Sequence, residues 1–264
     1  MSETPKKLYE ARGIIPKIFD FSGDDLPLVW NRCKESVRQG GSFWSKDMAR
    51  LDGEGHLVLS AKWDDSLNDG QGLLRTGAVQ TADELRNPTY APSYGYYEAK
   101  IKFPKTHKFA WGAFWQMAGD VFSVENGAAD GVEIDVMESI GNEIGSIQSA
   151  LHWDGYKEHH KTLNKPLFDH NVYDGNWHTF GCNRDEEGYK FYIDDVLTTS
   201  FSTDEVEACD KGGWLLLTVE ASPWIAGFNP LEGQYGGYAD IMRELYSEET
   251  VVMLVEYVKV WEER

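Results

Sequence analysis

Three acidic side chains lie within six residues of one apolar segment, residues 131–139. On a β-strand, successive side chains point to opposite faces, so Glu133 and Asp135 share one face. Glu138 breaks this alternation, and one extra residue near Met137, a β-bulge, would return it to that face. Carboxylates in one row repel each other, and that repulsion is typical of acids that transfer protons or attack a substrate. The alternative is a half-exposed strand with an ordinary polar face.

The chain has 264 residues, a hydrophobic fraction of 41% and a formal net charge of −19. Its 10 Trp, 13 Tyr and 12 Phe can fill a large β-rich core and also offer flat surfaces to sugar rings. The negative charge repels polyphosphate, so we expect no nucleic-acid partner. No apolar run reaches the roughly 18 residues of a membrane span, so we expect no membrane partner.

Cys33, Cys182 and Cys209 match no metal-binding spacing, and we expect three buried thiols, with a single disulfide left open. His159 and His160 lack acids at a suitable spacing for a metal, so we interpret them as part of a solvated loop. We therefore predict no metal-ligating residues.

The first 12 residues are polar and contain no apolar core of signal-peptide length. We expect a monomer.

The segments around the acids are typical of antiparallel strands. Apolar or alternating runs recur every 8–12 residues or so between turn residues, and no long helical period appears. The expected strands are 49–51, 56–61, 73–80, 94–103, 110–117, 131–139, 146–153, 177–183, 189–193, 196–197, 215–221 and 251–261. We expect irregular structure over 1–20, 30–43, 154–176 and 222–240, and a short helix or loop over 241–249. This pattern predicts one all-β domain over residues 1–264, an antiparallel sandwich.

Several of these segments resemble glycoside hydrolase family 16. The stretch EIDVME from Glu133 is similar to the bulged form of the family's active-site motif, E-x-D-x-x-E. Four further segments resemble family strands in the family's order: YGYYEAKIK from Tyr94, WGAFW from Trp111, WHTFG from Trp177 and VEYVKV from Val255. The resemblance covers about residues 48–263, and residues 1–47 match weakly.

The resemblance implies a β-jelly roll of two curved antiparallel sheets, with a concave cleft for a polysaccharide. It also implies a retaining endo-hydrolase in which Glu133 is the nucleophile, Glu138 the general acid/base and Asp135 the assisting acid. Glu133 must be ionised to attack the anomeric carbon, while Glu138 must then be protonated. Asp135 lies between them and can share a proton or a hydrogen bond with either.

Aromatic and polar residues near this motif are candidates for substrate binding. Trp115 stands in a family position at the cleft wall, and Trp111 shares its strand face, with core packing as the alternative. His152 resembles a histidine found in laminarinase-like members, with a purely structural hydrogen bond as the alternative. The remaining candidates are Arg75, Trp153, Glu220 and Trp224.

The substrate stays open at this point. Family frequency favours a β-1,3-glucan or a mixed-linkage β-1,3-1,4-glucan. Glu220 and Trp224 resemble galactan-cleaving branches instead, so the alternative is an endo-β-galactanase, agarase-like or acting on O-glycan or keratan-type chains. Met137, the extra residue of the motif, argues against the lichenase and xyloglucan-transferase branches. A non-catalytic carbohydrate-binding jelly roll and a transglycosylase are further alternatives.

Cofactor and location follow only from the resemblance. Hydrolysis needs no cofactor, and the family's fold allows one structural Ca²⁺ on the convex side, although no loop spells out a calcium motif. A polysaccharide substrate favours a secreted, extracellular protein. The absence of a signal peptide in the sequence is also compatible with an intracellular enzyme that acts on imported oligosaccharides.

Overall fold

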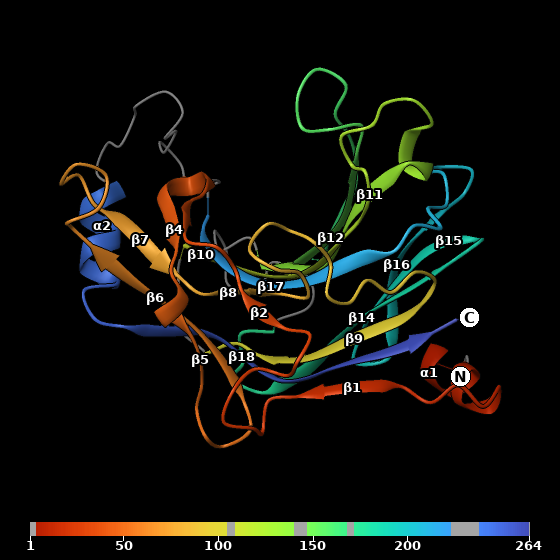
Figure 1. The fold of residues 1–264 in the computed structure, drawn as a ribbon, viewed down its shortest axis with the longest axis horizontal. Helices are drawn as coiled ribbons and strands as arrows, with labels where there is room; N and C mark the ends of the chain where they lie inside the picture. Colours follow the sequence, from red (N-terminus) through yellow and green to blue (C-terminus); the bar gives the residue numbers. More distant parts are fainter. Residues whose placement is uncertain (1–3, 105–108, 140–146, 168–171, 223–237, 264) are drawn as a thin grey trace.

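The computed structural model describes residues 4–104, 109–139, 147–167, 172–222 and 238–263. Within these residues the chain forms two large β-sheets that lie one above the other (Figure 1). Its two α-helices, α1 (Pro5–Ala11) and α2 (Tyr238–Leu245), lie at the periphery of the sheets. Short 3₁₀ turns occur at η1 (Gln39–Gly41), η2 (Lys46–Met48) and η3 (Gly127–Ala129).

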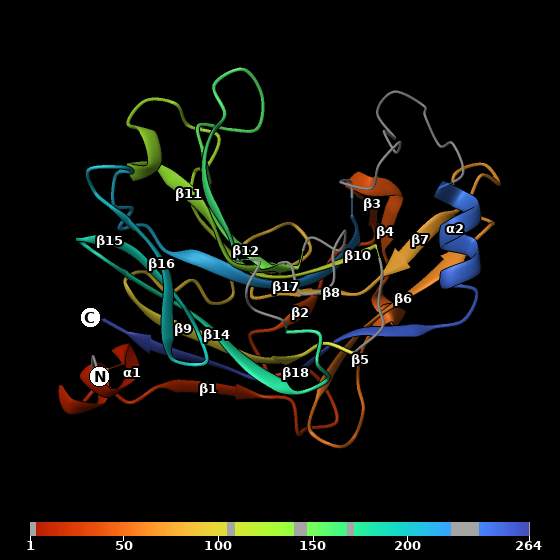
Figure 2. The same ribbon diagram turned by 180° about the vertical axis from the view of Figure 1, so that it is seen from behind.

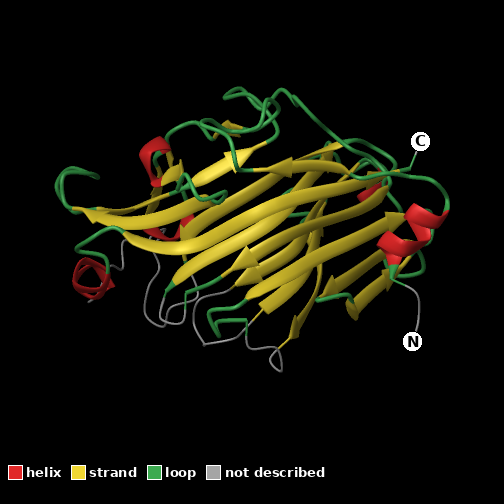
Figure 3. Ribbon diagram, turned by 90° about the horizontal axis from the view of Figure 1, so that it is seen from below, coloured by secondary structure: helices red, strands yellow, loops and turns green. Residues whose placement is uncertain are grey.

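The larger sheet, called sheet A, has eleven strands. They are β1 (Lys17–Asp20), β3 (Ser36–Val37), β4 (Ser42–Trp44), β5 (Ala49–Leu51), β6 (Leu57–Asp64), β7 (Leu73–Thr76), β9 (Gly95–Lys102), β14 (Trp177–Asp185), β15 (Gly188–Ile193), β16 (Val196–Ser202) and β18 (Thr250–Glu262). The main path is β16-β15-β14-β9-β18-β6-β7-β4-β3, with β1 paired to β18 and β5 to β6. Figure 3 shows these strands running side by side.

The smaller sheet, called sheet B, has seven strands. They are β2 (Asn31–Arg32), β8 (Ala78–Gln80), β10 (Ala110–Gly119), β11 (Gly131–Ser139), β12 (Ile147–Trp153), β13 (Lys161–Leu167) and β17 (Gly213–Ala221). Their order is β13-β12-β11-β10-β17-β8-β2. All described pairs in both sheets are antiparallel except β4 with β7. This architecture confirms the predicted β-jelly-roll sandwich.

Alternating apolar residues build the core between the sheets. Ile134 on β11 and Phe114 on β10 point into it from sheet B, while Tyr97 on β9 and Val258 on β18 point into it from sheet A. All four are 0% exposed. Because period-two alternation buries every second side chain of a strand, the intervening side chains of sheet B are left on its outer face.

One buried arginine links the two sheets. Arg184 on β14 is 0% exposed, and its Nη1 donates a 3.1 Å hydrogen bond to Gln116 Oε1 on β10. Its Nε donates to the Cys209 carbonyl oxygen at 3.0 Å, and its Nη2 donates to the Lys211 carbonyl oxygen. These carbonyl acceptors satisfy a charge that would otherwise be costly to bury.

Several expectations of irregular structure were wrong. Residues 1–20 contain α1 and β1, residues 30–43 contain β2, β3 and the start of β4, and residues 154–176 contain β13. Pairing with other strands stabilises these short elements, since β1 pairs with the distant β18 and β13 extends sheet B beyond its neighbour β12. Figure 2 shows β1 lying along β18. Most of 222–240 lies outside the described residues. Of the short helix or loop expected over 241–249, the structure forms the helix α2, which begins already at Tyr238.

The three cysteines are buried and unpaired, as expected. Among the described helices, none combines the length and apolar character needed to cross a membrane.

Candidate active site

A β-bulge in β11 brings the three acids onto one face of sheet B. Asp135 pairs with Ala150 on β12, and Glu138 pairs with Gln148. Three steps along β11 therefore match two steps along β12, so β11 carries one extra residue between these pairs. The pairing with β10 shifts at the same place. The bulge predicted near Met137 is confirmed.

The outer face of sheet B carries the acids in a row. On β10 their partners are Met117, Trp115 and Ala113, which are two residues apart and so share one face. On β12, His152 lies opposite Glu133. We call this surface the acid face and define it by Trp115, Glu133, Asp135, Glu138 and His152. It points away from sheet A, because Ile134 and Met137 fill the core behind it.

A buried side chain supports the bulge. Ser149 on β12 is 2% exposed, and its hydroxyl donates a 2.9 Å hydrogen bond to the carbonyl oxygen of Val136. The bulge interrupts the regular ladder there, and the Ser149 hydroxyl supplies this carbonyl with a side-chain partner. Ser149 therefore helps to hold Glu138 in line with the other two acids.

Glu138 and Asp135 are both buried at 4% exposure and have different partners. Gln148 Nε2 donates a 2.7 Å hydrogen bond to Glu138 Oε2. His152 Nε2 lies 3.3 Å from Asp135 Oδ2, which is an ion-pair distance. This contact is not a hydrogen bond, because Asp135 Oδ2 has no hydrogen-bond partner among the described residues. Asp135 Oδ2 is thus available to accept a hydrogen bond from a neighbouring protonated carboxyl group.

Burial raises the pKa of all three carboxyls. For Glu138 the pKa lies well above the usual range because of burial first and the charge of Asp135 second. Burial also raises the pKa of Asp135. The pKa of Glu133 is raised by burial and by Asp135, whereas a hydrogen bond from Tyr156 and the charge of His152 act in the opposite direction. Glu138 likewise receives a hydrogen bond from Gln148, which acts with the charge of His152 against the effect of burial. Each glutamate thus has one donor that favours its ionised form, while burial favours a proton on both.

Two tryptophans accompany the acids on β10. Trp115, opposite Asp135, donates a 3.0 Å hydrogen bond from its Nε1 to Thr218 Oγ1 on β17. Trp111 lies opposite Glu220 on β17, on the same strand face as Trp115. The Trp111 Nε1 is buried and has no partner within the described part of the chain. Both rings are partly exposed, so they can contact a ligand on the acid face.

Glu220 extends this surface and is held by a cation. Arg38 Nε donates a 2.9 Å hydrogen bond to Glu220 Oε1, and the Arg38 guanidinium lies 3.9 Å from the Trp44 ring centre. Glu220 is 5% exposed. Glu220, a predicted substrate-binding residue, therefore lies beside Trp111 on the same face of sheet B. Arg38 largely balances its charge.

Two other candidates, Trp153 and Arg75, are not brought to the acids. Trp153 points into the core from β12, opposite in direction to His152, and is 6% exposed. Arg75 on β7 contacts Ser45 and Asp47 and lies 3.7 Å from Asp64, so it joins strands of sheet A. Trp224 lies outside the described residues.

Three residues near the acids were missed from the sequence. Gln148 could have been found, since it lies four residues from His152 and thus on the same strand face. Tyr156 contacts Glu133 from the loop after β12. His160 lies in an exposed loop, as expected, and it also stacks on His152 at 5.1 Å between ring centres, with its Nε2 2.9 Å from His152 Nδ1.

Within the described residues, two groups bring three metal-binding side chains together. Glu133, Asp135 and His152 place one atom each within 4.8 Å of one another. The second group, Asp52, Glu54 and His56, belongs to the turn between β5 and β6. Each group has two carboxylates and one imidazole, whereas Ca²⁺ prefers six to eight oxygen ligands. Neither group fits a calcium site, and we assign the first to proton chemistry.

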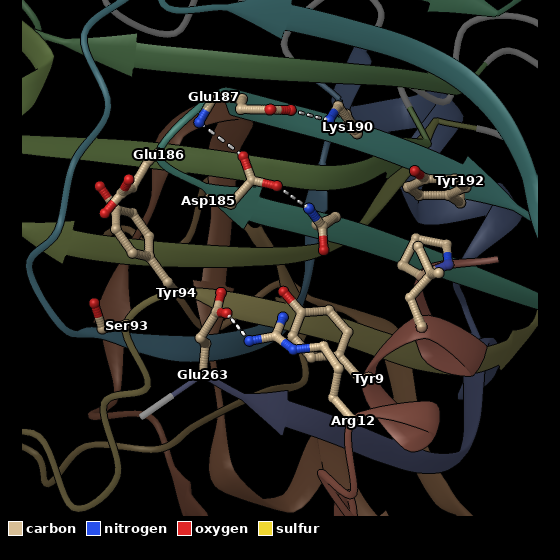
Figure 4. Close-up of a pocket in the computed structure, with 13 residues that line it drawn as sticks. Tyr9, Arg12, Ser93, Tyr94, Asp185, Glu186, Glu187, Lys190, Tyr192 and Glu263 are labelled. Atoms are coloured by element: carbon tan, nitrogen blue, oxygen red, sulfur yellow. Dashed lines mark hydrogen bonds and ion pairs between the residues drawn. The ribbon is translucent and has the colours of Figure 1, made fainter. Parts of the chain in front are cut away.

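A hollow of about 740 Å³ lies elsewhere, beneath α1 and beside the β14–β15 turn (Figure 4). The ion pair of Arg12 with Glu263 crosses it, and Asn183 Nδ2 donates to Asp185 Oδ2 at 2.6 Å. It shares no residue with the acid face, and its cationic side chains Arg12 and Lys190 already pair with Glu263 and Glu187. This hollow is therefore not the site that the three acids form.

A row of carboxylates beside tryptophans on one face of a β-sandwich suits the class of carbohydrate-active proteins. The model of the family described as "Glycosyl hydrolases family 16" matches residues 44–237. This is well over half of the chain, so the chain belongs to that family and is a glycoside hydrolase. A comparison with curated protein sequences gives no significant match.

Solved structures with the same fold carry different activities in their names. The catalytic domain of an endo-1,3-β-glucanase (laminarinase) from Thermotoga petrophila has 19% identity and a TM-score of 0.68, covering 94% of this chain and 97% of that one. A Bacteroides ovatus mixed-linkage glucan family 16 protein, solved with a product, has 21% identity and a TM-score of 0.66, covering 92% and 99%. Porphyranase B from Zobellia galactanivorans has 16% identity and a TM-score of 0.67, covering 93% and 90%. At these identities the likeness shows the fold alone.

Proposed function

We propose that this protein is a retaining endo-glycosidase that cleaves internal β-linkages of a neutral polysaccharide. The observation that carries the proposal is the bulged register of β11, which aligns Glu133, Asp135 and Glu138 on one face. A retaining hydrolase needs one carboxylate to attack and one carboxylic acid to protonate the leaving group. Glu138, which is buried and has a pKa well above its usual range, and the more exposed Glu133 suit these two roles.

The reaction proceeds in two displacements. Glu133 attacks the anomeric carbon while Glu138 donates its proton to the leaving glycosidic oxygen, which gives a glycosyl-enzyme. Glu138, now ionised, takes a proton from water as that water attacks the same carbon and releases Glu133. Asp135 lies between both acids, so its negative charge in the first step favours the proton on Glu138.

Aromatic side chains at both ends of the acid row support endo-action. Trp111 lies beyond Glu138 along β10, because Ala113 is already opposite Glu138. Tyr156 and Phe122 lie at the other end, beside Glu133, and are 42% and 66% exposed. Sugar rings on both sides of the cleaved bond would each find an aromatic surface.

We propose a β-1,3-glucan or mixed-linkage β-1,3-1,4-glucan as the substrate. The net charge of −19 disfavours an anionic chain, and the ion pair of Arg38 with Glu220 leaves little free positive charge beside Trp111. An endo-β-galactanase is the second candidate, because Glu220, which with Trp224 resembles galactan-cleaving branches, lies opposite Trp111 next to the acids. The named activities of the similar structures include both glucan and porphyran cleavage.

A digest of laminarin, lichenan, agarose and porphyran tests the substrate. We expect new reducing ends and short oligosaccharides from laminarin or lichenan, and none from the same digests with Glu133→Ala. Release from agarose or porphyran alone would replace the glucan proposal by the galactan one. Binding without any release would indicate a carbohydrate-binding protein.

Chemical rescue tests the role of Glu133. We expect Glu133→Ala to lose turnover and azide to restore part of it, because azide can attack the anomeric carbon in place of the missing carboxylate. The product is then a glycosyl azide, which mass spectrometry detects. Loss without any azide product would move the nucleophile to another residue.

We expect hydrolysis to need no cofactor, since the proposed steps use only carboxyl groups and water. Treatment with EDTA should therefore leave the turnover rate unchanged, and a Tm that falls with EDTA and recovers with Ca²⁺ would reveal a structural ion. We propose that the protein works as a monomer outside the cell, where polysaccharides of this kind occur.

A further inference from the structure

Tyr156, in the loop after β12, contacts the proposed nucleophile. Its phenolic O–H donates a hydrogen bond to Glu133 Oε2. Among the described residues, Tyr156 is the one hydrogen-bond donor that reaches this carboxylate. The Tyr156 ring is 42% exposed, so it meets Glu133 from the open side of sheet B rather than from the core.

Two loops hold Tyr156 in this place. The Gly155 amide donates a 2.7 Å hydrogen bond to the Val121 carbonyl oxygen, which joins the loop after β12 to the loop between β10 and β11. Phe122 packs edge-on against the Tyr156 ring, with 5.6 Å between ring centres and 72° between planes. Figures 1 and 2 show both loops rising together beside β11 and β12. These contacts therefore fix the position of the Tyr156 hydroxyl, and the side chain is not a freely rotating surface group.

The Tyr156 hydroxyl has the chemistry of a permanent donor. Burial and the negative charge of Glu133 raise the Tyr156 pKa, so the phenol keeps its proton wherever the acids titrate. The same hydrogen bond lowers the pKa of Glu133 and opposes the effects of burial and of Asp135. A donor to one carboxylate oxygen stabilises the ionised form and also fixes its orientation.

We propose that Tyr156 is a positioning residue for the reaction, which holds Glu133 as an oriented carboxylate through Oε2 and leaves Oε1 for attack. The inference rests on the proposed function, in which Glu133 is the nucleophile. In the second displacement the bond between the sugar and Glu133 breaks and the electron pair returns to the carboxylate. The Tyr156 hydrogen bond stabilises this returning charge, so the residue assists release as well as attack.

Tyr156→Phe tests this role, because it removes the hydroxyl and keeps the ring that packs on Phe122. We expect kcat to fall about 10- to 100-fold, which is the range for one hydrogen bond to a charged group. KM should stay within about twofold, since the ring still faces the substrate. The acidic limb of kcat/KM should move to higher pH, because Glu133 loses the donor that favours its ionised form.

The azide-rescued Glu133→Ala variant separates catalysis from structure. In that background Tyr156 has no carboxylate to hold, so adding Tyr156→Phe should change the rescued rate by less than about twofold. Tyr192→Phe is the matched control, because it removes the same atom beside the hollow on sheet A. We expect it to leave kcat and the pH profile unchanged.

Two results would overturn the inference. Unchanged kcat and pH profile in Tyr156→Phe would show that the hydroxyl does not act on Glu133. Equal losses with and without the Glu133 carboxylate would assign Tyr156 to substrate binding or to folding. Failure of azide rescue in Glu133→Ala alone is a different result, since it would refute the proposed nucleophile itself.

Discussion

At the scale of single residues, the raised pKa of Glu138 suits the role of general acid. We predict a bell-shaped dependence of kcat/KM on pH. The acidic limb reports protonation of Glu133, and the alkaline limb reports loss of the proton from Glu138. Because burial raises the pKa of Glu138, the alkaline limb should lie well above the ordinary glutamate value of about 4.3. A pH profile of hydrolysis with and without Glu138→Gln checks this, since the variant should lack the alkaline limb.

Glu138→Gln should also depend on the leaving group. We expect about a 10²- to 10⁴-fold loss of kcat on a polysaccharide, whose leaving oxygen needs a proton. An aryl glycoside with an acidic phenol needs little protonation, so its bond to the sugar should break at nearly the normal rate. Equal losses on both substrates would contradict the role of Glu138 as general acid.

The same substitution should change stability in a pH-dependent way. A carboxyl whose pKa is raised on folding contributes stability below its unfolded pKa and loses it as the pH rises through the folded value. Glu138→Gln removes this loss, because glutamine does not ionise. We therefore expect the variant to gain Tm relative to the parent at pH 8 but not at pH 4. Thermal denaturation of both proteins at pH 8 and pH 4 measures this difference in Tm. The same difference at both pH values would contradict the prediction.

At the scale of elements, the bulge of β11 depends on Ser149. Ser149→Ala leaves the buried carbonyl of Val136 without its 2.9 Å partner, so we predict a loss of about 1–3 kcal/mol in the free energy of unfolding. Activity should fall as well, since the bulge aligns Glu138 with Glu133. Ser200→Ala, at an exposed position of β16, is the control, and equal denaturation midpoints for both variants would contradict the role of Ser149.

The alternation of side chains made the bulge predictable, whereas the loops around it were not. Three acids can share a face of β11 only with an extra residue, and local parity is enough to infer it. Tyr156 reaches Glu133 because the Gly155 amide binds Val121, a contact between two loops that no local period encodes. Trp153 was predicted to bind substrate although strand parity argues against it. Its neighbour His152 faces the acids, so Trp153 points to the other face, into the core.

Short elements escaped prediction for a related reason. β1 has only four residues and owes its form to pairing with β18, more than 200 residues away in the chain. β13 forms by adding to the edge of sheet B at β12. Neither segment has an apolar alternation strong enough to indicate a strand by itself. Arg75 was likewise assigned from type and position, and its ion pairs with Asp47 and Asp64 became visible only in the fold.

At the scale of the whole molecule, Arg184 connects sheet A to sheet B. Arg184→Met removes the donor shared by Gln116 and the carbonyls of Cys209 and Lys211, so buried acceptors lose their partner. We predict a loss of about 2–4 kcal/mol in the free energy of unfolding, measured by urea denaturation. Arg50→Met breaks an exposed pair with Glu249 and should cost less than about 1 kcal/mol. Similar losses for both would contradict the role of Arg184.

The stereochemistry of cleavage tests the central claim most directly. Proton NMR of the newly formed reducing end, recorded in the first minutes before mutarotation, shows which anomer the enzyme releases. A double displacement through Glu133 and Glu138 predicts the β-anomer from a β-linked glucan, with the configuration of the substrate kept. Release of the α-anomer would mean a single displacement by water, and would contradict the assignment of Glu133 as the nucleophile.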